Sequence, residues 1–335
     1  MSRGALFRRI IGRIGIGGVV LTFWGCSNQP HFQPELVYPR HLKSWSSPFL
    51  YDYTYQTKTF RAGTLFFKPL FYNRKGEELG EFRMVGPGLA GKGNRLKVLE
   101  TGKVYTLPAP VLRATRHREL VAFLLTNNGY GVLNLSTGEI TFYQTGEQQF
   151  AGNYLGTAPL FYQQLIFFPL LSGDVVAYDL KSGRVLNRFV VSTSNSPFLN
   201  SILYLAVIDD SLYAATPTRI ILFAPHYFYD QTLPIKHILQ YNKNLYIFTR
   251  EGEILKFKPG LIREKSQKLK FAQLIAPTIC NQKIYTVERY TGYLIEIDPE
   301  SLEYLVFDGP KLDLRDPIRL EGCKIYNGPR VYSLE

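Results

Sequence analysis

The stretch from Gly173 to Val190 shows the pattern of hydrophobic and polar positions that recurs along this chain. Two short apolar runs, Val175 to Leu180 and Val185 to Val190, flank the turn Lys181-Ser182-Gly183. Both runs are rich in β-branched and aromatic residues, and Gly183 supplies the positive φ that a short hairpin turn requires. The pattern therefore predicts a β-hairpin.

Variants of this hairpin recur in register. Successive copies are 36, 45, 45, 34, 40 and 35 residues apart, and their aligned positions are Val98, Asn134, Asp179, Ala224, Lys258, Asp298 and Ser333. Units of four short strands that repeat about every 40–45 residues are typical of propeller blades. The sequence predicts an all-β fold, a single β-propeller of four-stranded blades. We count seven blades, and the irregular stretch from Tyr51 to Phe82 leaves room for eight.

The last copy ends at what should be the third strand of its blade, so another segment must supply the fourth strand. The apolar segment from Phe49 to Gln56 is the expected donor. The propeller ring would then be closed by an N-terminal strand, and both terminal edges would be paired.

Residues 1–25 have the features of an export signal. Four arginines accompany an apolar core of 11 residues, Ile14 to Trp24, which is short for a bilayer span of roughly 20 residues. The core ends at Gly25-Cys26, which resembles the lipobox of bacterial lipoproteins. Cys26 is therefore the expected lipidation site, which would carry acyl chains such as palmitate. An uncleaved anchor and an ordinary signal peptide are the alternatives.

Ser27 follows the cysteine at a position where Asp typically retains enterobacterial lipoproteins in the inner membrane. By analogy, we expect a lipid-anchored protein of the outer membrane that faces the periplasm. Residues 26–48, which contain the cysteine and several prolines, predict an extended tether without a core of its own. Residues 49–335 are assigned to the propeller.

The run from Ala177 to Leu186 resembles the repeat of the PQQ-like quinoprotein propellers, roughly Ala-x-Asp-x-x-Thr-Gly-x-x-x-Trp. Residues 133–142 and 295–307 are weaker copies. Asn187 stands where that family has its blade-docking Trp, and both tryptophans lie outside the predicted blades. We therefore expect Tyr and Phe side chains to pack between the blades.

A lipoprotein of this size with one such propeller also resembles the accessory lipoproteins of the outer-membrane β-barrel assembly machine. This resemblance implies a non-catalytic scaffold that binds protein partners through loops at one rim. The alternative is a periplasmic ligand-binding or sensor propeller with a small molecule in its central channel.

The formal net charge of +12 includes four leader arginines, which leaves +8 on the remainder. This mild excess suits an anionic membrane face, an acidic partner or a solvated basic surface. We expect no nucleic-acid partner, because no recognised binding motif accompanies the charge. The sequence contains no catalytic signature and no close pair of histidines with metal-ligand spacing, so we expect no enzyme activity, no cofactor and no metal.

Two groups of residues are candidates for a specific role. Arg113, Arg116 and Arg118 would converge on one rim if they lie in a loop between blades, where they could bind an acidic protein surface or a lipid headgroup; the alternative is a solvated loop. Cys280 and Cys323 occupy corresponding regions of consecutive blades. They either form a disulfide in an oxidising periplasm or remain two buried thiols.

The basic run from Arg263 to Lys270 falls on an expected outermost strand. Lysines on an exposed strand commonly prevent edge-to-edge pairing, and this is the interpretation we favour. A partner-binding stripe is the alternative.

Overall fold

A computed structural model of the chain describes residues 30–46, 55–61, 64–72, 78–147, 157–194, 196, 199–224, 226–316, 318–328 and 330–335. For residues 46, 55–61, 64–72 and 78 it describes only the backbone. Phe32–Glu335 forms one compact unit. Within the described part the regular elements are strands, and no helix there has the length and hydrophobicity needed to span a bilayer.

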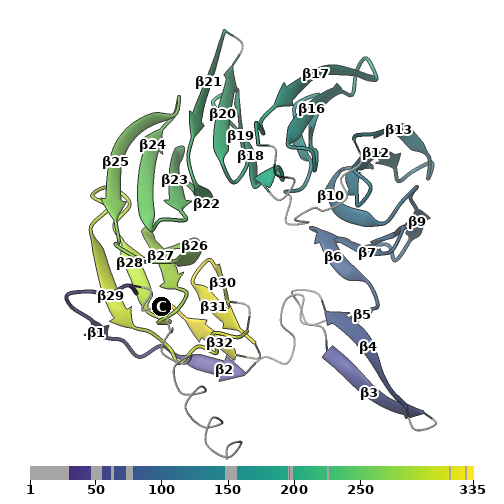
Figure 1. The fold of residues 1–335 in the computed structure, drawn as a ribbon. Coiled ribbons are helices and arrows are strands. Elements are labelled where there is room, and N and C mark those ends of the chain that lie inside the picture. The colour runs from purple at the N-terminus through teal and green to yellow at the C-terminus, as the bar shows by residue number, and fades with distance from the viewer. Residues whose placement is uncertain are drawn as a thin grey trace, which may run out of the picture. The chain divides into compact units, whose positions relative to one another are not determined.

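Seven antiparallel sheets follow one another like the blades of a propeller (Figure 1), and we number them blades 1 to 7 in chain order. Blade 1 contains β6 (Arg83–Gly86), β7 (Leu89–Lys92), β8 (Arg95–Val98) and β9 (Val104–Thr106). Blade 2 contains β10 (Val111–His117), β11 (Leu120–Leu125), β12 (Gly129–Asn134) and β13 (Ile140–Thr145). Blade 3 contains β14 (Leu160–Tyr162), β15 (Leu165–Pro169), β16 (Asp174–Asp179) and β17 (Arg184–Val190).

The remaining blades continue this order. Blade 4 contains β18 (Tyr204–Ile208), β19 (Ser211–Ala215), β20 (Arg219–Ala224) and β21 (Tyr227–Thr232). Blade 5 contains β22 (Ile235–Tyr241), β23 (Asn244–Thr249), β24 (Glu253–Lys258) and β25 (Ile262–Lys268). Blade 6 contains β26 (Leu274–Cys280), β27 (Lys283–Glu288), β28 (Leu294–Ile297) and β29 (Tyr304–Asp308). Blade 7 contains β30 (Ile318–Glu321), β31 (Lys324–Asn327), β32 (Arg330–Ser333) and a strand from the N-terminal segment, β2 (Ser44–Ser46). The predicted propeller of four-stranded blades is thus confirmed.

Blades 1 to 6 run from the inside of the propeller to the outside in chain order, and in blade 7 the outer strand is β2 from the N-terminal segment. The first strands of neighbouring blades contact one another, as β10 does with β6 and β14, and β26 with β22 and β30. The middle strands are buried along almost their whole length, whereas fourth strands such as β13, β17, β21 and β25 are largely exposed. The middle strands read as continuous apolar runs because both of their faces pack against other blades.

The hydrophobic core consists of layers between neighbouring blades, and six clusters of buried side chains fill the six interfaces from blades 1 and 2 to blades 6 and 7. Aromatic residues pack there, as expected from Asn187 at the position of the docking Trp, although Trp45 lies in a blade, on β2 of blade 7. Phe142 of blade 2 stacks on Tyr178 of blade 3 with a centroid distance of 4.1 Å, and Phe189 of blade 3 lies 4.4 Å from Phe223 of blade 4.

The turn between the third and fourth strands follows the predicted repeat. In blade 3 the Asp179 carboxylate accepts hydrogen bonds from the backbone N–H groups of Lys181 and Ser182, and Gly183 has a φ of 66°. Asn134 and Asp298 do the same in blades 2 and 6. A short polar side chain closes this turn because it satisfies backbone donors that no strand can reach, and the residue of positive φ that follows is glycine in blades 2 and 3 and Leu302 in blade 6.

Residues 32–46 pack on the propeller, whereas an extended tether without a core of its own was expected for residues 26–48. Phe32 is buried between blades 5 and 6, and β1 (Tyr38–Pro39) pairs in parallel with β29. The strand β2 then pairs antiparallel with β32 and becomes the fourth strand of blade 7. An N-terminal strand was predicted there, but the donor is Ser44–Ser46 rather than residues 49–56. Of the expected donor, residues 49–54 lie outside the described residues, and Tyr55 and Gln56 belong to a different sheet.

That sheet has three strands, β3 (Tyr55–Arg61), β4 (Thr64–Tyr72) and β5 (Glu78–Gly80). It is formed by the irregular region that left the number of blades open between seven and eight. The described residues therefore contain seven four-stranded blades and one smaller sheet. The signal peptide and Cys26 lie outside the described residues and stay predictions.

Candidate functional site

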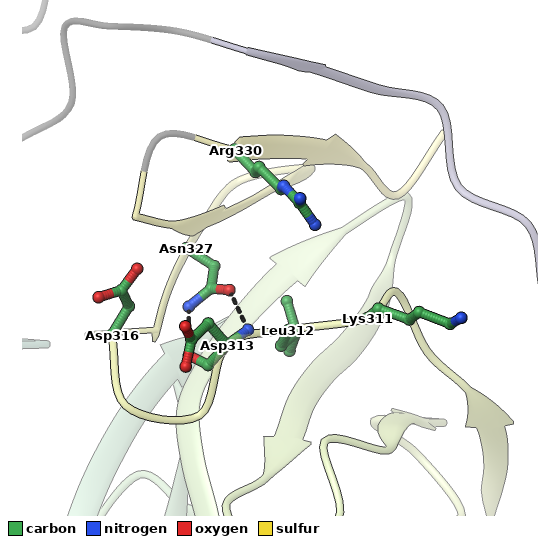
Figure 2. Close-up of a pocket in the computed structure, with 6 residues that line it drawn as sticks. All are labelled: Lys311, Leu312, Asp313, Asp316, Asn327 and Arg330. Atoms are coloured by element: carbon green, nitrogen blue, oxygen red, sulfur yellow. Dashed lines mark hydrogen bonds between the residues drawn. The ribbon is translucent and has the colours of Figure 1, made fainter.

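A pocket opens at the rim of the propeller between blades 6 and 7. Its volume is about 460 Å³, and its walls come from the loop that joins β29 to β30 and from the β31–β32 turn. The lining residues are Lys311, Leu312, Asp313, Asp316, Asn327 and Arg330, which Figure 2 shows. Pockets of about 300–1,000 Å³ are of the size that holds a small molecule or a few side chains of a partner.

Asn327 fixes the shape of this pocket. Its side chain is 3% exposed, and it reaches from the β31–β32 turn to the loop. Its Oδ1 accepts a hydrogen bond from the Asp313 N–H at 2.6 Å, and its Nδ2 donates to the Asp313 carbonyl at 2.9 Å, as the dashed lines in Figure 2 mark. The loop is therefore held by a buried side-chain amide that pairs with both the N–H and the carbonyl group of Asp313.

Gly328 brings the turn close to the loop. It has a φ of 54°, and a Cβ at this position would collide with the Asp316 carboxylate. The Tyr332 hydroxyl donates to the Lys311 carbonyl at 3.3 Å on the other side. The pocket is thus preorganised by backbone contacts as well as by side chains.

The charges of the pocket are distributed unevenly. Asp313 forms two hydrogen bonds with the Arg315 guanidinium, and these bonds, together with the Arg315 N–H, lower the pKa of Asp313 to about 2. Lys311 and Arg330 have no ion-pair partner within 4 Å among the residues that the structure describes. Asp313 is ionised, but its charge is balanced by Arg315, so Lys311 and Arg330 remain suited to bind a carboxylate of a partner.

Buried polar side chains also hold the equivalent turns of other blades. Buried Glu288, in the β27–β28 turn, accepts N–H groups from Gln273, Tyr290 and Thr291. Buried Asn128, in the β11–β12 turn, donates to the Glu147 carbonyl and accepts from the backbone of blade 3. Buried polar side chains therefore set the loop conformations on this rim.

The three predicted arginines do not gather at one point. Arg113 lies near the start of β10, Arg116 near its end, and Arg118 follows in the turn to β11. Side chains three residues apart on a strand point to opposite faces, and five residues of strand span about 16 Å. Arg116 pairs with Glu100 of blade 1 at 2.6 Å, and its Nε donates to the Arg118 carbonyl.

Cys280 and Cys323 form a disulfide with a Cα–Cα distance of 4.8 Å. It joins the end of β26 to the β30–β31 turn and lies in the layer between blades 6 and 7. The sequence left the pairing open because equivalent points on neighbouring blades need not be close. They are close here because the first strands of blades 6 and 7 contact one another.

The basic run from Arg263 to Lys270 lies on the outermost strand β25 as far as Lys268, as predicted, and its last two residues follow the strand. Arg263 pairs with Glu253 at 2.9 Å and Lys268 with Glu251 at 3.6 Å. No group of three or more His, Cys, Asp or Glu side chains in the described part is arranged to hold a metal ion.

The residues of the pocket were not identified from the sequence. Loop residues such as Lys311 and Asp313 follow no periodic pattern, and only the fold brings them next to Asn327 and Arg330. The one available signal was the Asn-Gly pair at 327–328, which is typical of a turn with positive φ.

The fold and this site define a β-propeller with a preorganised rim pocket. No family model matches the chain. In solved structures the fold is similar to BamB from Moraxella catarrhalis, with a TM-score of 0.62, 14% identity, and coverage of 87% of this chain and 99% of that one. The C-terminal WD40 domain of Sif2 has a TM-score of 0.55 and 12% identity over 80% of this chain and 85% of its own.

Among curated proteins, the chain is similar to the plasminogen-binding protein PgbB of Helicobacter pylori. In strain J99 the two are 28% identical over 233 residues, and in strain 26695 they are 26% identical over the same length. The matched region covers 68% of this chain but 43% of the relatives, so the similarity spans less than half of their length.

Proposed function

We propose that this chain is a protein-binding scaffold that resembles BamB in function as well as in fold. In this proposal it is a lipoprotein with a PQQ-like propeller, anchored to the outer membrane at Cys26 and facing the periplasm. It binds protein partners that take part in the assembly of outer-membrane β-barrel proteins, and it has no catalytic role.

The observation that carries the proposal is the rim pocket. Its loop is held by Asn327, and its two cations, Lys311 and Arg330, have no ion-pair partner within 4 Å among the described residues. A rigid pocket with free cations suits a carboxylate-bearing segment of a partner, because little conformational entropy is lost on binding. The resemblance to BamB supports the proposed partner class.

The packed N-terminal segment adds a geometric consequence. If Cys26 carries the lipid, five residues lie between the anchor and Phe32, which is buried in the propeller. Over six residue steps at about 3.3–3.6 Å each, this linker spans at most about 22 Å. The propeller would then work close to the membrane surface, where outer-membrane proteins are inserted.

Affinity purification from membranes tests the partner. The wild-type chain should co-purify a protein of the β-barrel assembly machinery, and Arg330→Glu combined with Lys311→Glu should abolish this. Lys103→Glu, an equally exposed reversal in the β8–β9 turn, is the matched control and should retain the partner. Retention by the double variant would reject the pocket as the binding site.

Radiolabelled palmitate tests the anchor. The label should be incorporated into the wild type and not into Cys26→Ser, which should leave the membrane fraction. Labelling of the serine variant would reject Cys26 as the lipidated residue.

A second function follows from the curated relatives. Their similarity over 233 residues supports plasminogen binding by this chain. Purified protein immobilised on a sensor surface should then bind plasminogen from solution. Binding of plasminogen without recovery of any assembly protein would favour this function over the first.

A further inference from the structure

The outer edge of each propeller blade is a strand that could pair with another chain, and most blades prevent this. Blades 1 and 7 end in strands of three residues, β9 and β2. The outer strands of blades 2, 3 and 5 each contain a β-bulge, and β1 lies along the outer strand of blade 6. Short strands, bulges and covering segments are the usual protections of a sheet edge.

Blade 4 has none of these protections. Its outer strand β21 has six residues and pairs with β20 along its whole length without a register shift. The strand contains no Lys, Arg or Pro, in contrast to the cation-rich β25 of blade 5. Among the described residues, β21 pairs only with β20, so its second edge is free (Figure 1).

The same strand carries three exposed aromatic residues in succession. Tyr227, Phe228 and Tyr229 are 52%, 51% and 45% exposed. Tyr227 and Tyr229 alternate with Phe228 between the two faces of the strand, so an added strand would find aromatic neighbours on both faces. Exposed aromatic groups of this kind are characteristic of interaction sites.

The molecule already adds a strand to an outer edge elsewhere. At blade 6, Tyr38 and Pro39 of β1 pair in parallel with Phe307 and Asp308 of β29. The rings of Tyr38 and Phe307 lie 6.0 Å apart. Strand addition accompanied by aromatic contact is therefore compatible with the geometry of these blades.

The net charge indicates which occupant fits. The formal net charge of the chain is +12, and it is +8 without the four arginines of the predicted leader. Two copies of the chain therefore repel one another, whereas an acidic polypeptide is attracted. Asp230, the one acid of β21, is already paired with Arg219 at 2.8 Å and does not oppose such a partner.

We propose that the free edge of β21 binds an extended segment of an acidic partner protein by strand addition. The segment places apolar side chains against the exposed aromatic residues of β21. This site lies on the outer side of blade 4, apart from the pocket at blades 6 and 7, and does not depend on the function proposed above.

The test uses the purified full-length chain and a labelled peptide with alternating Val and Thr, flanked by Glu at both ends. Fluorescence anisotropy should show saturable binding. Tyr229→Lys should weaken it by about tenfold, because a lysine on the edge opposes pairing. Leu186→Lys is the matched control. Leu186 is also an exposed hydrophobic residue of an outer strand, but it is the extra residue of the β17 bulge, so this variant should bind like the wild type.

Hydrogen exchange on the wild type does not depend on how the variants fold. Peptide binding should slow the exchange of amides in residues 227–232. A peptide with N-methylated core amides should not bind, since it cannot pair, and a Lys-flanked peptide should bind more weakly.

Equal binding of the N-methylated peptide would overturn strand addition, and stronger binding of the Lys-flanked peptide would overturn the acidic partner. Sedimentation that shows a dimer lost in Tyr229→Lys would place a second copy at β21 and also overturn the proposal.

Discussion

Lys256 carries its charge in a buried position of β24. Its side chain is 2% exposed, and its Nζ lies 2.6 Å from Glu300 and 3.1 Å from Glu264. Burial opposes the charged form, but the hydrogen bonds to both carboxylates outweigh it, so the pKa of Lys256 is raised. Glu264 is the extra residue of the β25 bulge, which turns it toward the lysine.

Two substitutions of Lys256 should separate the stability that comes from packing of its side chain from the stability that comes from its ion pairs. Lys256→Met should cost less than about 1 kcal/mol, because Glu300 is exposed and Glu264 keeps Lys258 at 2.8 Å. Lys256→Ala should cost about 2–3 kcal/mol, because it leaves a cavity. Urea unfolding measures both. Equal costs for the two variants would show that the ion pairs, and not the buried stem, stabilise this site.

His237 predicts a pH dependence of stability. Burial, assisted by the positive charge of Lys236, lowers the pKa of His237 from 6.5 to about 4. The unfolded chain therefore takes up a proton between about pH 6.5 and 4 that the folded chain does not. The free energy of unfolding should fall by about 2–3 kcal/mol as the pH is lowered through this range.

Urea unfolding at several pH values measures this loss. His237→Gln should flatten the profile between pH 6.5 and 4, whereas substitution of the exposed His41 by Gln should leave it as in the wild type. A profile that stays steep in His237→Gln would assign the dependence to other groups.

At the scale of elements, the disulfide joins the first strand of blade 6 to the first hairpin of blade 7. The two cysteines are 43 residues apart, and chain entropy predicts a stabilisation of about 2–4 kcal/mol for a loop of this length. The double variant Cys280→Ala, Cys323→Ala should lose this amount in urea unfolding. Reduction of the wild type should lower its stability to the same level, and an unchanged midpoint would contradict the prediction.

The strands and turns could be predicted from the sequence because each blade repeats the same local chemistry. The third strand, the turn at Asp179 and Gly183, and the fourth strand all follow from short runs of β-branched and aromatic residues separated by turn formers. Ser44–Ser46 gave no such signal, since a strand of three residues is defined only by its partner β32. The pocket was missed for the same reason, because Asn327 acts on a loop that no local pattern describes.

At the scale of the whole molecule, the N-terminal segment connects blades 6 and 7. The segment places β1 on β29 and β2 on β32, and Arg40 lies between these two pairs. Its guanidinium forms an ion pair with Glu296 at 3.0 Å and donates to the Leu334 carbonyl at 2.9 Å. It also lies 4.9 Å from the centre of the Phe307 ring.

Arg40 should therefore hold the segment that contains β1 and β2 against blades 6 and 7. Arg40→Ala should lower the free energy of unfolding by about 2 kcal/mol, since it removes a charge-assisted hydrogen bond, a backbone contact and a cation–π contact. Hydrogen exchange should rise first in residues 330–335, because β32 then loses support from β2.

Arg40→Lys should recover only part of the stability, because an ammonium group cannot reach both oxygens in the same way. Lys43→Ala, in the same segment but with an exposed side chain, should behave like the wild type. Unchanged exchange at the C-terminus of Arg40→Ala would show that β2 holds blade 7 without this arginine.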